Sequence, residues 1–390
     1  MSSVSGGSVG MAVLDSAPTL AKARDYMTDI AGPDALAAGI DGLLLHDMIA
    51  GFTGLDLAAA QMPAGQRFSD RAGLIESAWR SEDARMEQAF PPRRPALPWR
   101  LLFNSTDAAS GCRAIIADRA LTASPSTADP DNLSCDLRSA VPGSGSFDFF
   151  AKLYCTRHIA MVTAAMLSAR FPYITPSGAV ANCDRKNVLA GQFVDGGYVD
   201  SSGLLTLADL IPGLTAEIRV RNASAVAQAQ PGRPVTLVVP IVMYLGNSPR
   251  PDLVDSPVTP IQESVLPVDA QSAASAQRSA SDTMLQRIQG MLGVDQWLQC
   301  DPAQPECGPV ESVAGQAVPY QVIFVSPRTE PRISAPLGWV LSAASRDTLA
   351  SELAEEEVRH GDPCMNRPHP HVCLSGVGAM GDLVQFIGSG

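Results

Sequence analysis

The sequence predicts an α/β fold in which helices cover a central sheet. Segments with helical spacing of apolar residues alternate with short apolar runs that are typical of strands. The longest run, residues 235–245, is apolar on both faces, as expected for a strand buried between helices, and Pro240 within it predicts a bulge or an edge. A hydrophobic content of 46% with 17% charged residues indicates a globular chain.

The first element is a serine framed by glycines. Ser8 follows Gly6 and Gly7, precedes Gly10, and stands before an apolar run at residues 11–14. Glycines accept strained dihedral angles and leave space around a hydroxyl, so this stretch suits a sharp strand-to-helix turn. Ser8 is the candidate nucleophile of this elbow, although the stretch taken alone also fits a flexible linker.

The second element is an apolar run that ends in Asp195, Gly196 and Gly197. A carboxylate at the end of a buried strand can take the proton of a serine held within hydrogen-bond reach, and the two glycines allow the chain to turn tightly beside it. We therefore predict a Ser8–Asp195 dyad without histidine, with oxygens about 2.6–3.2 Å apart. The helix should begin at Ser8, and the backbone N–H of Val9 is the expected oxyanion donor.

Asp200, five residues beyond the predicted base, serves as a control. We expect it to point away from the dyad and to bond the turn at residues 201–203.

Apolar spacing and helix breakers predict the other elements. Helices at 35–59 and the 171–176 loop are expected to supply an apolar pocket beside the dyad. The other expected elements are a helical insertion over about 20–95, a pair of strands at 99–104 and 113–117, a loop at 120–147, a helix at 157–169, a short helix at 204–211 ended by Pro212 and Gly213, a helix at 270–292, a strand at 320–325 and an acidic helix at 346–358.

The elbow serine together with the Asp-Gly-Gly-Tyr turn at 195–198 resembles the patatin-like phospholipase family. Residues 101–107, 165–173 and 336–342, with Asp70, Glu76 and Trp79, are similar to segments of its larger bacterial members, in the same order. The resemblance implies a three-layer α/β/α domain over residues 1–355, with a central mixed sheet and a helical insertion after the elbow, followed by a tail at 356–390. It also implies a lipid acyl hydrolase that works through an acyl-enzyme.

The family carries a glycine-rich oxyanion loop on the strand before the elbow, and nothing before Met1 supplies it here. We therefore expect a missing N-terminal segment of the same protein to be a partner, and weak or no activity without it. The main alternative is a non-catalytic or truncated module that acts in binding or assembly. A Ser-His-Asp hydrolase using His360, His369 or His371 is a further alternative.

The charge balance narrows the partners. A net charge of −12 argues against nucleic acid and against strongly anionic membranes, and it leaves neutral or zwitterionic lipid surfaces open. The expected ligand is a lipid or another acyl ester. No uninterrupted apolar run of about 20 residues is present, so no segment of this sequence is expected to span a bilayer. A cytoplasmic or peripheral membrane location is the expectation.

Eight cysteines give few further signals. Two pairs lie in Pro-rich stretches where local disulfides can close, Cys300–Cys307 and Cys364–Cys373. His369 and His371 beside the second pair match no familiar zinc spacing, so neither a metal nor a cofactor is expected. Buried thiols are the simplest interpretation of Cys112, Cys155 and Cys183.

Overall fold

The computed structural model describes the chain in separate stretches. These are residues 1–31, 35–42, 70–91, 99–119, 121, 135, 145–152, 158–171, 175–181, 189–230, 235–238, 240–246, 281–292, 322–325, 347, 348, 350, 351 and 354. The chain divides into two compact units, of which the first comprises residues 1–206, 261–280 and 337–341. The predicted boundary between residues 355 and 356 lies outside the described residues.

The first unit contains a mixed sheet of six strands in the order β5-β4-β3-β8-β7, with β1 also paired to β3. The pairs β1–β3 and β4–β5 are parallel, whereas β3–β4, β3–β8 and β7–β8 are antiparallel. The strands are β1 (Ser2–Val4), β3 (Leu102–Asp107), β4 (Arg113–Ala117), β5 (Ser146–Asp148), β7 (Gly178–Ala181) and β8 (Leu189–Asp195). This arrangement confirms a mixed α/β fold with a central sheet.

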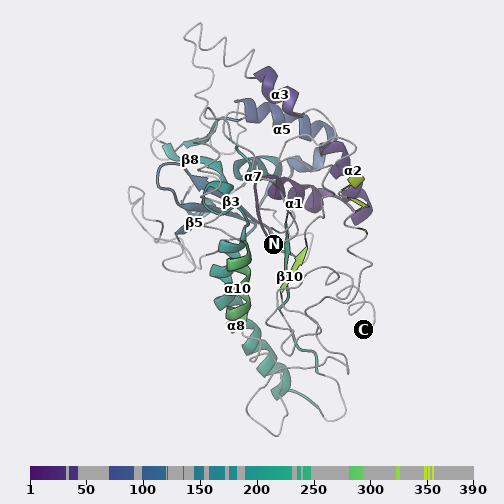
Figure 1. Cartoon of the computed structure of the whole chain (residues 1–390), viewed down its shortest axis with the longest axis vertical. Helices are drawn as coiled ribbons and strands as arrows, with labels where there is room; N and C mark the ends of the chain where they lie inside the picture. The colour runs from purple at the N-terminus through teal and green to yellow at the C-terminus, as the bar shows by residue number, and fades with distance from the viewer. Residues whose placement is uncertain are drawn as a thin grey trace, which may run out of the picture. The chain divides into compact units, whose positions relative to one another are not determined.

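Helices pack against this sheet around α7 (Met161–Ser168). Helix α7 contacts β3 and β8, and α1 (Gly6–Ser16) and α5 (Arg71–Glu82) both pack against α7 (Figure 1). The remaining elements are α2 (Leu20–Ala31), α3 (Ala35–Asp41), the 3₁₀ helices η2 (Ala84–Glu87) and η4 (Gly196–Tyr198), α6 (Phe149–Lys152), and the antiparallel pair of β2 (Ala89–Phe90) with β6 (Ile159–Ala160).

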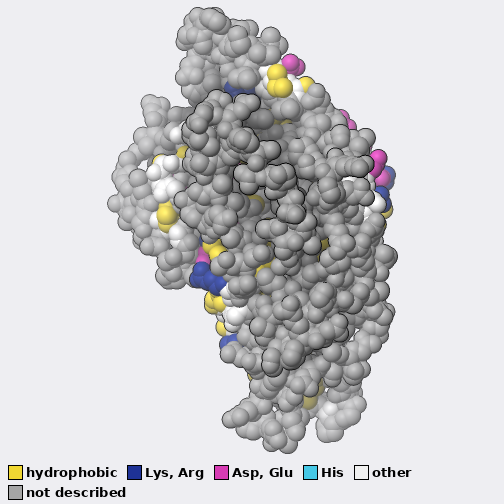
Figure 2. Space-filling view, viewed as in Figure 1, with side chains coloured by type: hydrophobic (Ala, Val, Ile, Leu, Met, Phe, Trp, Pro, Cys, Tyr) yellow, Lys and Arg dark blue, Asp and Glu magenta, His cyan; other side chains and the backbone are white. Residues whose placement is uncertain are grey.

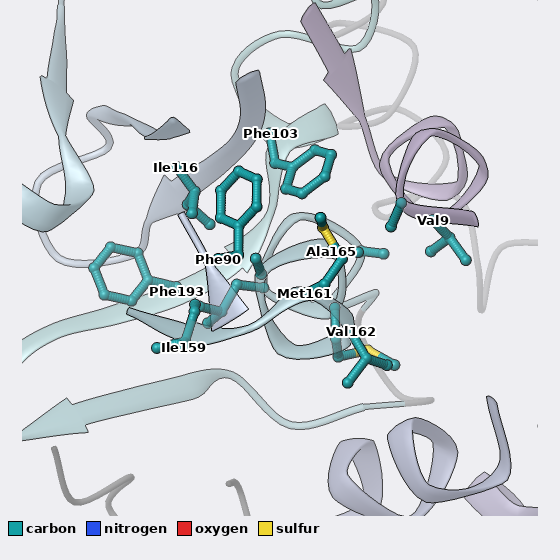
Figure 3. Close-up of a cluster of buried hydrophobic side chains, with 14 of the residues drawn as sticks. Val9, Phe90, Phe103, Ile116, Ile159, Met161, Val162, Ala165 and Phe193 are labelled. Atoms are coloured by element: carbon teal, nitrogen blue, oxygen red, sulfur yellow. The ribbon is translucent and has the colours of Figure 1, made fainter. Parts of the chain in front are cut away.

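The core of this unit surrounds α7, whose eight residues are all buried. Figure 3 shows Met161 and Ala165 of this helix beside the rings of Phe90 and Phe103. Those two rings stack with their centroids 5.1 Å apart. Small residues on α7 allow its backbone to approach the strands closely, as the sequence predicts, and a helix without a polar face is stable only when it is enclosed in this way.

The predicted elements of the first unit are largely confirmed. The strand pair at 99–104 and 113–117 appears as β3 and β4, with β3 beginning three residues later than expected. The insertion at 20–95 is helical in α2, α3 and α5. Helix α5 packs in the core, because Ile75 and Trp79 are buried in the cluster around α7. Most of the 120–147 loop lies outside the described residues.

The second unit contains most of α8 (Leu204–Ala227), together with α10 (Ser281–Leu292) and the parallel pair β9 (Val242–Leu245) and β10 (Val322–Val325). Strand β10 and helix α10 lie within the predicted ranges 320–325 and 270–292. The acidic segment at 346–358 is helical at its described residues, 347, 348, 350, 351 and 354.

The prediction that a helix ends at Pro212 is wrong, because α8 continues through this residue to Ala227. Proline in a helix interior removes one hydrogen bond and costs about 3 kcal/mol. Buried residues run past it with helical spacing, from Ile211 just before the proline to Thr215, Ile218 and Asn222 after it. Burial of this stripe offsets the loss at Pro212.

The prediction of a long buried strand over residues 235–245 is also wrong. Among the described residues of this run, only Val242–Leu245 forms a strand, and it pairs with β10 in a two-stranded sheet. Met243 and Leu245 are exposed, so the apolar character of the run does not reflect burial on both faces. Pro240 marks the break, because proline donates no ladder hydrogen bond and the strand begins only after it.

Candidate active site

The candidate site lies where two strands end against one edge of β3. Strand β1 runs parallel to β3 and pairs Val4 with Asn104. Strand β8 runs antiparallel to β3 and pairs Asp195 with Ser105. The two strands therefore run toward each other along the same edge of β3, and their last residues pair with the neighbouring residues Asn104 and Ser105. This topology brings together two residues that are 190 positions apart, Ser5 and Asp195.

Ser5 occupies a strained turn between β1 and α1. Its backbone angles are φ 52° and ψ −132°, and no other non-glycine residue in the described part of the chain has positive φ. Such conformations cost about 1–3 kcal/mol and persist only where the surroundings enforce them, which is common at functional sites. The Ser5 hydroxyl donates a hydrogen bond of 2.6 Å to Oδ2 of Asp195. A strand, a strained serine and a helix follow one another here, which is the arrangement of residues in a nucleophile elbow.

The carboxylate of Asp195 is buried. Its other carboxylate oxygen, Oδ1, accepts the Gly197 N–H at 2.7 Å. Burial raises the pKa of Asp195 to about 6, against the opposing effect of the hydrogen bonds from Ser5 and Gly197. A carboxylate with a pKa near 6 is ionised at neutral pH and still accepts a proton readily, which suits a general base.

Gly196 is required by a close approach between two backbones. A Cβ atom at this position would lie 2.1 Å from the carbonyl oxygen of Asn104 and 2.7 Å from Cγ2 of Val4. Only a residue without a side chain fits against β3 there. Gly196 therefore permits the tight turn that the sequence predicts. Gly197 donates its N–H to the Asp195 carboxylate, which the sequence did not indicate.

The prediction that Ser8 faces Asp195 is wrong. Ser8 is fully buried, and its hydroxyl bonds Ser168 at 2.8 Å and Ser3 at 3.1 Å. The physical reason is that α1 begins at Gly6, so Ser8 lies inside the first helical turn and faces the interior. The strand-to-helix turn instead lies at Ser5, within Ser3-Val4-Ser5-Gly6-Gly7. The two glycines directly after Ser5 are the sequence signal for it.

The free N–H groups at the start of α1 also differ from the prediction. The Val9 N–H already bonds the Ser5 carbonyl at 3.4 Å, so the prediction of Val9 as a donor is wrong. Gly6 and Gly7 are exposed at the start of α1, where the first N–H groups of a helix have no intrahelical acceptor. The structure gives these two N–H groups no acceptor among the described residues. Gly10 contributes to packing instead, because a Cβ there would lie 3.4 Å from Met27 of α2.

Asp200 behaves as the predicted control. Its carboxylate accepts hydrogen bonds from the N–H groups of Ser202, Gly203 and Leu205, and it lies 4.0 Å from Arg113. These partners hold Asp200 on the turn that precedes α8 and leave Asp195 as the carboxylate that Ser5 contacts.

A second buried polar cluster lies behind the site, between α5 and α7. Arg170 pairs with Asp70 at 2.7 Å, and its carbonyl accepts the Asp195 N–H at 2.9 Å. Glu76 is fully buried and accepts the Thr163 hydroxyl at 2.7 Å through Oε2, while Oε1 has no partner. Burial raises the pKa of Glu76 to about 7. The sequence does not predict this cluster, because nothing in the spacing of Asp70, Glu76, Thr163 and Arg170 indicates that they lie together.

The cysteines differ from the prediction where they are described. Cys112 forms a disulfide with Cys135, so its assignment as a buried thiol is wrong. The bond is not visible in the sequence because the partners are 23 residues apart, without a local pairing signal. Cys155, Cys183, the pairs Cys300–Cys307 and Cys364–Cys373, and the three candidate histidines at 360, 369 and 371 lie outside the described residues.

Other candidate features concern metals, membranes and surface charge. Among the described residues, no group of three His, Cys, Asp or Glu side chains could hold a metal ion. In the same part of the chain, no helix combines the length and apolarity that crossing a bilayer requires. The coloured charged side chains in Figure 2 include both signs, without an extended basic patch among them. Most of the predicted apolar pocket, at 43–59 and 172–174, lies outside the described residues.

No family model, curated protein or solved structure matches this chain. The case for a function rests on the chemistry of the Ser5–Asp195 pair.

Proposed function

We propose that this chain is an acyl-ester hydrolase with Ser5 as nucleophile and Asp195 as general base. One observation carries the proposal: the 2.6 Å hydrogen bond from the hydroxyl of a strained elbow serine to a buried carboxylate. A structural serine needs neither a positive φ nor a place between a strand end and a helix start. Both features are those of a nucleophile presented to a substrate.

The reaction divides into two steps. In the first, Asp195 takes the Ser5 proton as Oγ attacks the ester carbonyl carbon, and the proton then passes to the leaving alcohol as its bond to carbon breaks. This leaves an acyl group on Ser5. In the second step, Asp195 takes a proton from water, whose oxygen attacks the acyl carbon. Ser5 then leaves with that proton, and the carboxylic acid is released.

Gly6 and Gly7 are the candidates to stabilise the oxyanion of both steps. Their N–H groups lie at the positive end of α1, immediately after the nucleophile. Removing one donor of this kind typically lowers kcat by about 10²–10³-fold. Further donors from an upstream glycine-rich loop, as the family resemblance implies, would add to these two.

A lipid is the proposed class of substrate. The basis is the resemblance to patatin-like phospholipases, which also implies their three-layer α/β/α arrangement. With Ser5 as nucleophile, the elbow matches the Gly-x-Ser-x-Gly pattern at its second glycine, Gly7, while Ser3 stands at the position of the first. The Asp-Gly-Gly turn at 195–197 and the mixed sheet support the same assignment.

The test compares wild type with Ser5→Ala, Asp195→Asn and Ser8→Ala on 4-nitrophenyl butyrate and on phosphatidylcholine vesicles. We expect the first two variants to lose hydrolysis by a factor of about 10³ or more, and Ser8→Ala to lose no more than about tenfold. Equal rates for wild type and Ser5→Ala would contradict the proposal and support a non-catalytic module. Hydrolysis of 4-nitrophenyl butyrate but not of phosphatidylcholine would support the ester-hydrolase chemistry and contradict a lipid as the substrate.

A further inference from the structure

We propose that Ser168, the last residue of α7, is a positioning residue that holds Ser5 in its strained conformation and sets its separation from Asp195. This inference rests on the proposed function. Ser168 contacts neither the reacting hydroxyl nor the base, so it acts through the backbone on both sides of the dyad.

Ser168 contacts the backbone of Ser5. The Ser5 N–H lies 3.2 Å from both Oγ and the carbonyl oxygen of Ser168. A residue with φ of 52° relaxes toward negative φ unless its peptide groups are held. On the other side of Ser5, its carbonyl accepts the Ser8 N–H at 2.9 Å. Ser168 therefore fixes the N–H end of the elbow, and the start of α1 fixes the carbonyl end.

Ser168 also contacts β3, the strand that pairs with both β1 and β8. Ser168 Oγ donates to the carbonyl of Asn104 at 2.5 Å. That same carbonyl is the atom against which Gly196 packs. One hydroxyl thus bonds the nucleophile's peptide and the carbonyl that limits the position of the Asp195–Gly196 turn.

The hydroxyl of Ser168 uses all of its hydrogen-bonding capacity. A serine hydroxyl donates once and accepts twice. Ser168 donates to Asn104, accepts the Ser5 N–H, and accepts the Ser8 hydroxyl at 2.8 Å. Ser168 is fully buried, so its orientation is fixed by these three bonds and not by water. This assigns a role to Ser8 as well, since its hydroxyl holds that of Ser168.

The experiment measures the rate at which a fluorophosphonate modifies the full chain. In this reaction, Ser5 Oγ bonds phosphorus, fluoride leaves, and the serine proton passes to Asp195. We expect Ser168→Ala to react about 10–100-fold more slowly than wild type, because a displacement near 1 Å at a reacting group costs up to about 10²-fold. The acid limb of its pH–rate profile should also move to higher pH. The hydrogen bond from Ser5 lowers the pKa of Asp195, and this effect weakens when that bond loosens.

The matched control is Thr163→Val, which removes another buried hydroxyl of α7 while keeping the side-chain volume. Thr163 contacts Glu76 and not the elbow, so its variant should lose stability while its rate and acid limb stay unchanged. Ser168→Thr keeps the hydroxyl and should remain within about threefold of wild type if it folds. Ser8→Ala, which removes one of the three bonds to Ser168, should be intermediate, about 3–10-fold slower.

The outcomes separate the two proposals. A wild-type chain that does not react at Ser5 contradicts the proposed hydrolase and this inference together. A wild type that reacts, with Ser168→Ala equal to it in rate and acid limb, overturns the role of Ser168 and leaves the hydrolase standing. If Ser168→Ala does not fold, Ser8→Ala decides in the same way: a slower rate supports the inference, and an unchanged rate overturns it.

Discussion

Gly196 lies directly against the carbonyl of Asn104, at a distance that admits no side chain. We expect Gly196→Ala to lower the free energy of unfolding by about 3 kcal/mol or more, because a Cβ 2.1 Å from a backbone oxygen forces β3 and β8 apart. Urea unfolding followed by circular dichroism measures this. Gly7→Ala is the control. Gly7 lies in α1, and a Cβ there would be 4.0 Å from the nearest atom, Cβ of Ser3. That variant should gain up to about 1 kcal/mol, and equal losses in both variants would contradict the close approach.

The pH dependence of hydrolysis should report the Asp195 carboxyl. Burial raises its pKa to about 6, and only the ionised form accepts the Ser5 proton. We therefore expect kcat/KM to be low at pH 5, to rise through a midpoint near pH 6, and to level off above pH 7. Initial rates over this range test the prediction. A midpoint near pH 4, that of an ordinary aspartate, would show that the base lies in water or is a different group.

Glu76 should make stability fall as pH rises. Burial raises the Glu76 pKa from 4.5 to about 7, so the folded state keeps a proton that the unfolded chain has already released. The stability from this group is complete below pH 4.5 and is lost as pH rises through 7, by on the order of 3 kcal/mol.

The variant Glu76→Gln removes this titration. Its free energy of unfolding, measured in urea at pH 4.5, 6 and 8, should lack the part of the decline that Glu76 causes. Asp195 contributes to the decline in both proteins because its pKa is also raised, so the difference between the two curves carries the test. Parallel curves would mean that Glu76 is ionised throughout.

The Cys112–Cys135 disulfide should stabilise the first unit. Closing a loop of 23 residues restricts the unfolded chain and contributes about 3 kcal/mol. We expect dithiothreitol to lower the thermal midpoint of the wild type and to leave that of the Cys112→Ser/Cys135→Ser double variant unchanged. A midpoint that does not respond to the reductant in the wild type would argue against the bond.

The sequence predicts those features that local pattern determines. Asp195 ends a run of apolar residues and precedes two glycines, and each of these signals has a single structural meaning. Strands β3 and β4 and helix α7 follow in the same way from apolar runs and small residues.

The choice between Ser5 and Ser8 depends on contacts that local pattern does not contain. Four serines and three glycines share residues 2–10, and several registers of a strand-to-helix turn fit them equally. The observed register follows from pairing of β1 with β3 and from the burial of Ser8 against Ser168. Helix α8 is a second example. Burial of residues spread along the helix outweighs the destabilising effect of Pro212, which local pattern alone would predict to end the helix.

The most direct test of the central claim is the mass of the intact protein after reaction with a fluorophosphonate. It asks only which serine is nucleophilic, and it does not require rapid turnover. If Ser5 is activated by Asp195, wild type and Ser8→Ala each gain one adduct, whereas Ser5→Ala gains none. An adduct on Ser5→Ala together with none on Ser8→Ala would contradict the account and return the nucleophile to Ser8.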